Sequence, residues 1–253
     1  MKREELISEF TQCDIPQWIC PKCEVSVLHA GKDDFKSFET EESKRNHSHD
    51  EFEPDWIVEH FLATLNCTNP KCKEKVLVTG QGRVRHSYVE DPYGNLSEEF
   101  ITHFKPRFFF PSLKIFKVAE TTPDEIKEIL FASFELFFCN PPAAANLARV
   151  ALEKVIDFLG IRTFKSRTGR RIRVSLHERI NLLPAKLSKE RDLFMAIKWL
   201  GNAGSHENEI SQADLIDLYE IFEKLLSEVY EKKDAKISKL AKEVNKRKGP
   251  TKR

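Results

Sequence analysis

The sequence predicts an α+β protein with a β-rich N-terminal half and an α-helical C-terminal half. Three observations carry this prediction. Apolar and polar residues alternate over residues 24–28, 76–80 and 83–89, which is typical of half-buried strands. Apolar residues recur at helical spacing between residues 126 and 229, behind clear capping signals. Two short-spaced cysteine pairs lie among the predicted strands.

The N-terminal domain is expected to cover residues 1–117. A turn is predicted at residues 91–94, and the Phe-rich run over residues 103–116 is expected to be a buried strand or an extended segment. An insertion at residues 31–55 is strongly acidic, since residues 33–59 carry ten acidic and three basic side chains. We expect a solvated, partly disordered loop there. The alternative is a loose metal site at His47 and His49.

The helical domain is expected to cover residues 122–230. Thr122 is predicted to cap a first helix with Pro123 at its first position. The Asn140-Pro-Pro sequence ends that helix, and a second one runs over residues 143–159. Capping boxes at residues 175–178 and 211–214 open two further helices, with another helix over residues 190–200 between them.

The cysteines predict a metal site. Cys20 and Cys23 form one pair, and Cys67 and Cys72 form a second pair after 43 further residues. Two tight turns of this kind can aim four thiolates at one point and complete a tetrahedral shell, which suits Zn²⁺. Such a shell has no open position, so we expect one structural Zn²⁺ per chain. The alternative is two unrelated reduced pairs. Cys13 could replace a ligand but is expected to be a small apolar side chain, and Cys139, on an apolar helix face, is expected to lie in the core.

A second set of candidate residues is polar and lies on predicted helices. Arg149 and Glu153 are four residues apart and share one helix face, and the same spacing relates Asn202 to His206. His206 has the pKa range of a general acid or base. The alternative for Arg149 and Glu153 is a surface ion pair that contributes little to stability. The helix around them is otherwise apolar on most sides, so we expect this pair to be half-buried and specific. The alternative for His206 is a histidine that caps or bridges helices in a buried network, and residue types alone favour this structural role.

These residues lie within a stretch that resembles the bacterial domain-of-unknown-function 4145 family. The resemblance covers about residues 122–230, and a zinc ribbon in front is a common arrangement in that family. It implies a helical domain similar to the HEPN class, many of whose members are dimeric, metal-independent ribonucleases of toxin and antiphage systems. The matching positions are residues 123–125, 144–153, Gly160, 176–180, Leu183, Gly201, Asn202 and His206.

The HEPN motif has an arginine followed a few residues later by a histidine. Asn202 and His206 fit this pattern, but Gly201 stands where the arginine is expected. The family's arginine before the Gly-Asn pair is Lys198 here. An arginine would supply fixed charge to the transition state, which a glycine cannot do. Lys198 or Arg149 from a neighbouring helix is the alternative source of that charge.

Basic residues are concentrated in two segments of the chain. The net charge is only +1, which excludes a globally basic protein. The tail over residues 231–253 carries ten basic and three acidic residues. A predicted interhelical loop contains no acid and forms the candidate nucleic-acid-binding set. The alternatives are a solvated tail or pairing with the acidic insertion. The loop residues are Arg162, Lys165, Arg167, Arg170, Arg171 and Arg173.

Together these observations favour a non-catalytic module that binds nucleic acid or a protein partner. The resemblance implies a place in antiphage or restriction-linked defence and a homodimer. A ribonuclease is the first alternative, with His206 as acid–base, Asn202 orienting, and Lys198 or Arg149 supplying charge. A structural homodimeric adaptor is the second. No apolar stretch has the roughly 20 residues of a membrane span, and the N-terminus lacks a signal-peptide core, so we expect a cytoplasmic protein.

Overall fold

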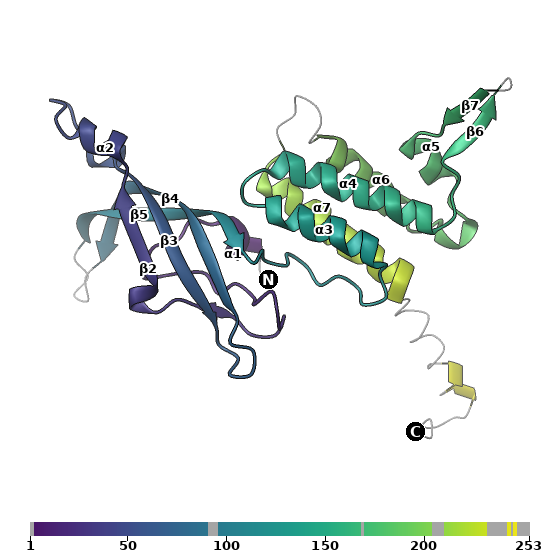
Figure 1. Cartoon of the computed structure of the whole chain (residues 1–253), viewed down its shortest axis with the longest axis horizontal. Helices are drawn as coiled ribbons and strands as arrows, with labels where there is room; N and C mark the ends of the chain where they lie inside the picture. Colours follow the sequence, from purple (N-terminus) through teal and green to yellow (C-terminus); the bar gives the residue numbers. More distant parts are fainter. Residues whose placement is uncertain are drawn as a thin grey trace. The chain divides into compact units, whose positions relative to one another are not determined.

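The chain forms two compact units, residues 1–115 and 116–253. The computed structural model describes residues 3–90, 96–167, 170–203, 210–231, 242–243 and 245–246, so the predicted basic tail lies almost entirely outside the described residues. The first unit is strand-rich and the second is mainly helical (Figure 1). No helix in the described ranges combines the length and the apolar character needed to cross a membrane.

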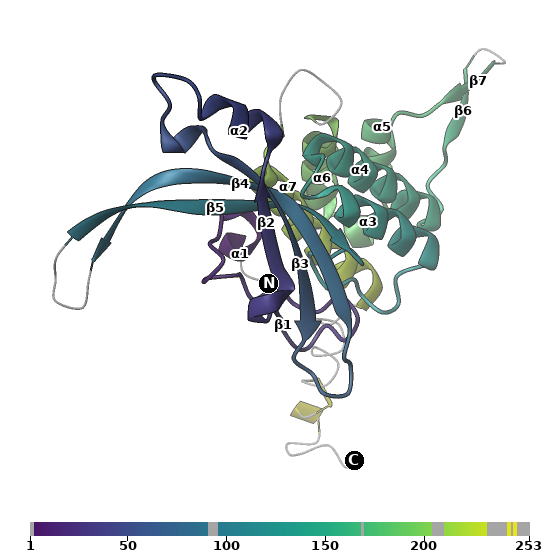
Figure 2. The same ribbon diagram turned by 60° about the vertical axis from the view of Figure 1, so that its left-hand side comes forward.

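The N-terminal unit contains a five-stranded antiparallel sheet. Its edge strands β1 and β2 both pair with β3, which pairs with β4, and β4 pairs with β5. Figure 2 shows β4 and β5 continuing beyond β3 as a curved two-stranded arm. A short helix precedes the sheet. The bounds are α1 (Arg3–Ile7), β1 (Leu28–His29), β2 (Phe35–Glu39), β3 (Val58–Cys67), β4 (Lys75–Glu90) and β5 (Leu96–Phe110).

The core of this unit packs against one face of the sheet. The rings of Phe35 and Phe61 stack with their centroids 5.3 Å apart, and Phe104 lies edge-on to both. Phe10 packs on the same cluster from the N-terminal segment. Trp18 is buried, and its indole N–H donates to the carbonyl of Glu5. The aromatic cluster therefore holds the N-terminal segment against the sheet.

A β-bulge changes which side chains of β5 face this core. Thr79 pairs with Phe108 and Gly80 pairs with Pro106, so Arg107 has no partner in the ladder. The extra residue reverses the alternation that follows it. Phe104 is 3% exposed, whereas Phe108 and Phe110 are 55% and 77% exposed. The expectation that the Phe-rich run is buried is therefore wrong for Phe108 and Phe110.

Two further expectations for the N-terminal unit are wrong. Residues 24–26 form a turn rather than a strand, and Val25 is largely exposed. The acidic insertion is folded: it contains β2, a helix, and two 3₁₀ turns. Thr40 caps the helix, and His47 Nε2 lies 2.7 Å from Glu39 Oε1. The added elements are η1 (Lys32–Asp34), α2 (Glu41–Asn46) and η2 (Pro54–Trp56).

Local capping signals decide most helix boundaries in the C-terminal unit. Asn140 Oδ1 accepts from the N–H of Ala143, so the second helix begins at Pro141, directly after the predicted break. The capping boxes at Ser175 and Ser211 are confirmed. Thr122 does not cap the first helix; its buried hydroxyl has no hydrogen-bond partner within the described residues. The helices are α3 (Asp124–Leu136), α4 (Pro141–Phe158), α5 (Leu176–Asn181), η3 (Ala185–Leu187), α6 (Arg191–Ala203), α7 (Gln212–Leu226) and the π-helical η4 (Ser227–Glu231).

A short hydrogen-bond chain joins three of these helices inside their apolar core. The Ser133 hydroxyl donates to the carbonyl of Ala144, at 2.7 Å. Ser133 Oγ lies 2.6 Å from the hydroxyl of Tyr219, which therefore acts as the donor to it. All three groups are buried, and burial raises the pKa of Tyr219. The chain connects α3, α4 and α7 with every hydroxyl partnered.

We expect Ser133→Ala to destabilise the helical unit by about 1–3 kcal/mol, because it leaves the buried Tyr219 hydroxyl without an acceptor. Tyr219→Phe removes the hydroxyl itself and leaves no buried donor without an acceptor. This variant should lower the free energy of unfolding by only about 1 kcal/mol. The double variant should be no less stable than Ser133→Ala alone. Urea unfolding of the wild type, the two single variants and the double variant measures the four free energies of unfolding. Losses in the double variant that equal the sum of the two single losses would contradict this prediction.

Candidate functional site

The four paired cysteines meet at one point in the N-terminal unit. Their Sγ atoms all lie within 4.8 Å of one another, with 3.8 Å between Cys20 and Cys72 and 3.7 Å between Cys23 and Cys67. A tetrahedral ion with metal–sulfur bonds of about 2.3 Å requires sulfur separations of about 3.8 Å. A disulfide requires about 2.05 Å. The four cysteines therefore form a site that can hold a metal ion.

Two similar turns bring the sulfurs together. In the first turn the N–H of Glu24 donates to the carbonyl of Cys20, and in the second the N–H of Lys73 donates to the carbonyl of Asn69. Glu24 and Lys73 each follow the second cysteine of a pair, and both adopt a left-handed conformation, with φ of 54° and 55°. This conformation is costly for a residue with a side chain. Its recurrence at both turns indicates that the sulfur geometry imposes it.

The protein environment favours thiolate at one sulfur and thiol at another. Hydrogen bonds from the backbone N–H groups of Val25 and Ser26 lower the pKa of the Cys23 thiol to about 6. Burial raises the pKa of the Cys67 thiol to about 12 and also raises that of Cys20. A bound cation would stabilise the thiolate form of the buried cysteines as well.

Side chains outside the sulfur cluster fasten the two turns together. Lys22, between the first two cysteines, lies 2.7 Å from Glu74, which follows the second pair. Lys114 forms an ion pair with Glu24. Cys13 is exposed and Cys139 is half-buried, and neither joins the cluster. The expectation of a buried place for Cys139 is met only in part.

The basic stretch forms a β-hairpin rather than the predicted loop. Strand β6 (Phe164–Arg167) pairs with β7 (Arg170–Arg173), and the hairpin projects from the helical unit (Figures 1 and 2). Only Thr168 and Gly169 separate the strands in the sequence. A two-residue connection that contains glycine is a hairpin signal, and it could have corrected the prediction. All of β7 is exposed.

Two of the basic residues in this stretch are paired with carboxylates of the helical unit, and the others that the structure describes are not. Lys165 lies 2.5 Å from Glu178, and Arg173 lies 3.2 Å from Glu153. The guanidinium of Arg171 stacks on the Phe164 ring, 3.9 Å from its centroid. Within the described ranges Arg162 and Arg170 form no ion pair, and the side chain of Arg167 lies outside them. Arg170 and Arg171, the outer arginines of the hairpin, are therefore available to an anionic partner.

Arg149 and Glu153 are half-buried on α4, as the apolar surroundings predict. Arg149 Nη1 donates to Glu153 Oε1 at 2.8 Å, and Glu153 also accepts from Arg173. Arg179 is almost fully buried and reaches Asp157 Oδ1 at 2.5 Å. The three arginines and Glu153 line a pocket of about 430 Å³. Its arginines are engaged with carboxylates, which favours a role in joining α4 to α5 and β7.

The structure describes only some of the remaining candidate catalytic residues. Gly201 lies directly against Arg149, because a Cβ at Gly201 would come within 2.6 Å of the Arg149 Cβ. Lys198 is buried, which lowers its pKa, and its Nζ lies 3.2 Å from the centroid of the Trp199 ring. Asn202 is half-buried, and His206 lies outside the described residues. The catalytic roles of these residues stay predictions.

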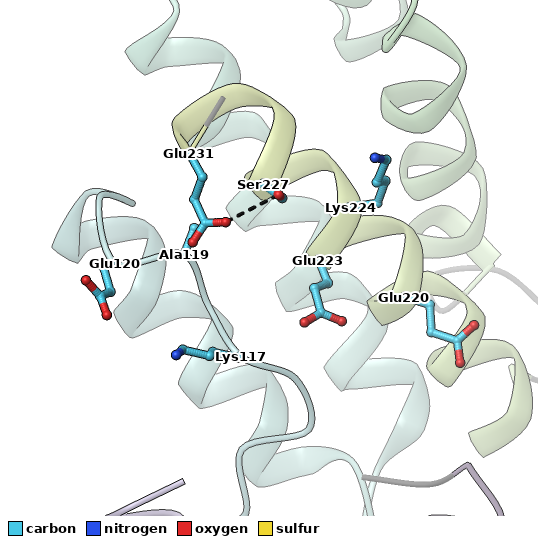
Figure 3. A pocket seen from close by; sticks show the side chains of 8 residues that line it. All are labelled: Lys117, Ala119, Glu120, Glu220, Glu223, Lys224, Ser227 and Glu231. Carbon is cyan, nitrogen blue, oxygen red and sulfur yellow. Dashed lines mark hydrogen bonds between the residues drawn. The ribbon is translucent and has the colours of Figure 1, made fainter. Parts of the chain in front are cut away.

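A further pocket in the helical unit is acidic. It has a volume of about 370 Å³ and lies between residues 117–120 and the C-terminal part of α7 with η4. Figure 3 shows four glutamates around it; Ser227 donates to Glu231 at 3.3 Å. A surface of this charge repels phosphate. The sequence analysis did not identify this pocket, and its residues are Lys117, Ala119, Glu120, Glu220, Glu223, Lys224, Ser227 and Glu231.

Two family models match the chain. A domain of unknown function, DUF8608, matches residues 8–109, and a domain of unknown function, DUF4145, matches residues 132–247. The second match confirms the part of the resemblance that concerns DUF4145. The first match contains all four clustered cysteines. No curated protein and no solved structure matches the chain significantly.

We expect the purified protein to hold one metal ion per chain at this cluster. Cys67→Ser should abolish the bound metal and lower the melting temperature of the N-terminal unit, because a structural metal contributes directly to folding. Cys13→Ser and Cys139→Ser are matched controls, since they remove a thiol that lies outside the cluster. Elemental analysis combined with thermal unfolding measures both effects. Equal metal content in Cys67→Ser and the controls would contradict the assignment.

Proposed function

We propose that the protein is a non-catalytic nucleic-acid-binding module in which Zn²⁺ stabilises the N-terminal unit and the hairpin β6–β7 contacts phosphates. One observation carries this proposal. The basic stretch forms an exposed, projecting hairpin, and it contains no carboxylate. Its outer arginines form no ion pair within the described residues, so they keep their charge for a polyanion.

Zn²⁺ is the ion that fits the cysteine cluster best. Four thiolates form a soft, tetrahedral donor set, which selects zinc or iron among the common metals. All four positions of such a shell are filled by protein, so the ion supports the fold and offers no place to a substrate. The two turns would then act as the paired knuckles of a zinc ribbon joined to a larger sheet. Elemental analysis distinguishes zinc from iron.

The shape of the hairpin suits a duplex groove. Neighbouring residues of a strand point to opposite faces, so Arg170 and Arg171 lie on opposite sides of the ribbon. A two-stranded ribbon fits the major groove of B-DNA, which is about 12 Å wide. The major groove of A-form RNA is too narrow for it. Arginines on both faces can contact the phosphate walls on either side, which favours duplex DNA as the partner of this element.

The wider context of the proposal rests on the resemblance. It supports a HEPN-like character for the helical unit, a homodimer, and a partner from an antiphage or restriction-linked system in the cytoplasm. The arginines on α4 and α5 are engaged with carboxylates, which favours a structural role for them over a catalytic one.

We expect the double variant Arg170→Glu/Arg171→Glu to bind duplex DNA at least about tenfold more weakly than the wild type. The slope of log affinity against log salt should fall by about two, because two phosphate contacts are lost. Fluorescence anisotropy with a labelled 20-base-pair duplex, over a salt series, measures both quantities.

The double variant Lys186→Glu/Lys189→Glu is a matched control, since it makes the same charge change at exposed residues of the same unit. Similar losses in both double variants would show that net charge alone matters and would contradict the proposal. Incubation of the same proteins with labelled RNA tests the ribonuclease alternative. RNA cleavage that His206→Ala abolishes would select that alternative.

A further inference from the structure

The five-stranded sheet has one face that no described part of its own unit covers. The aromatic core packs against the other face. Five large apolar side chains on the open face, from all four main strands, are between 46% and 77% exposed. Exposed apolar area of this extent on one face is characteristic of a binding surface. The five residues are Phe38, Leu62, Leu77, Phe108 and Phe110.

The open face contains a hollow with an aromatic ring on either side. Its volume is about 510 Å³, and Phe38 of β2 and Phe108 of β5 both line it. The floor is a cross-strand row in which Phe38 pairs with His60 and His60 pairs with Gln81. Because β2 and β5 are three strand spacings apart, the two rings stand on strands about 14 Å apart. The hollow therefore offers two separate flat apolar surfaces.

The bulge in β5 builds this hollow. Arg107 is the residue without a partner in the ladder, and its side chain lines the hollow beside Phe108. Without the extra residue, Phe108 would face the core with Phe104. Gly80, opposite the bulge, allows the close approach, since a Cβ there would lie 2.1 Å from the carbonyl oxygen of Lys105. One local irregularity thus places a cation and an aromatic ring on the open face.

The charged groups around the hollow on this face are cationic. Lys36 and Lys105 lie on the same side of the sheet as Phe38 and Phe108, by the alternation of their strands. Within the described ranges, Lys36, Lys105 and Arg107 form no ion pair with a carboxylate. Where β2 to β5 lie together, Glu59 points to the core side and accepts from Thr102. Asp34 is engaged at the far end of β3 with Asn66.

This chemistry selects one occupant. Isolated cations beside exposed rings match a chain that carries phosphates and flat bases, and base–aromatic stacking contributes about 1–3 kcal/mol per base. A second copy of the same face would bring lysines and arginines against each other, which opposes self-association. A duplex keeps its bases stacked inside and cannot present them to Phe38 and Phe108.

We propose that the open face of the sheet binds single-stranded nucleic acid, with bases stacked on Phe38 and Phe108 and phosphates contacted by Lys36, Lys105 and Arg107. This site is separate from the hairpin of the helical unit and goes beyond the function proposed above. The bases supply most of the affinity through stacking, so binding tolerates different base sequences.

The test uses the full-length, metal-loaded protein and a labelled 15-nucleotide oligothymidine in anisotropy titrations. Phe38→Ala/Phe108→Ala should weaken binding at least about fivefold for each ring removed and leave the salt slope unchanged. Arg107→Ala should instead lower the slope by about 0.7, the value for one phosphate contact on a single strand. An oligomer with abasic sites should bind the wild type as weakly as oligothymidine binds the double variant.

Phe158→Ala/Trp199→Ala is the matched control, because it removes two exposed aromatic rings from the helical unit. The variant Arg170→Glu/Arg171→Glu should lose duplex binding and keep base-dependent binding of single strands. The two proposed sites can therefore be disproved independently of each other. Oligothymidine affinity that is unchanged in Phe38→Ala/Phe108→Ala would overturn the proposal. A dimer in sedimentation that this variant alone dissociates, with no change in oligonucleotide affinity, would show instead a self-association surface.

Discussion

The convergence of four sulfur atoms is the constraint on which the N-terminal unit depends. Two turns separated by 43 residues must meet to within a few ångströms, and both accept left-handed backbone conformations to do so. One turn lies in the segment that leads to β1, and the other joins β3 to β4. Since β1 pairs with β3 beside Cys67, the cluster fixes where the central strands begin their pairing. The register that follows decides which residues share the open face.

Charge is sorted over the surface of this protein, although the total is close to zero. The outer hairpin arginines and the open sheet face present cations, whereas a pocket beside α7 gathers four glutamates. We therefore expect a polyanion to be attracted to the first two surfaces and repelled from the third. The net charge of +1 does not reveal this arrangement. It excludes a globally basic protein but does not exclude local basic surfaces that could bind nucleic acid.

Features set by local chemistry could be predicted from the sequence, and features set by pairing could not. The Asn140 break and the Ser175 and Ser211 caps depend on neighbouring residues, and the cysteine spacing already indicated a shared site. The exposure of Phe108 depends on a single unpaired residue, Arg107, in a ladder with β4. The acidic insertion folds because β2 finds a partner in β3. Alternation and charge count within one segment contain no information about such partners.

The four-cysteine site would repel a phosphate once it held a metal ion. We therefore distinguish this site, which would support the fold, from the surfaces proposed to bind nucleic acid. Four thiolates around a divalent ion carry a net charge of about −2. Exposed lysines at positions 71 and 73 lie beside the second turn, and Lys22 and Lys114 are engaged with Glu74 and Glu24. Lys22 and Lys114 are therefore already paired with carboxylates, and they are not equivalent to the open-face cations, which form no ion pair within the described ranges. We accordingly expect phosphate contacts on the sheet face and the hairpin, while an ion bound by the four cysteines would act only by supporting the fold.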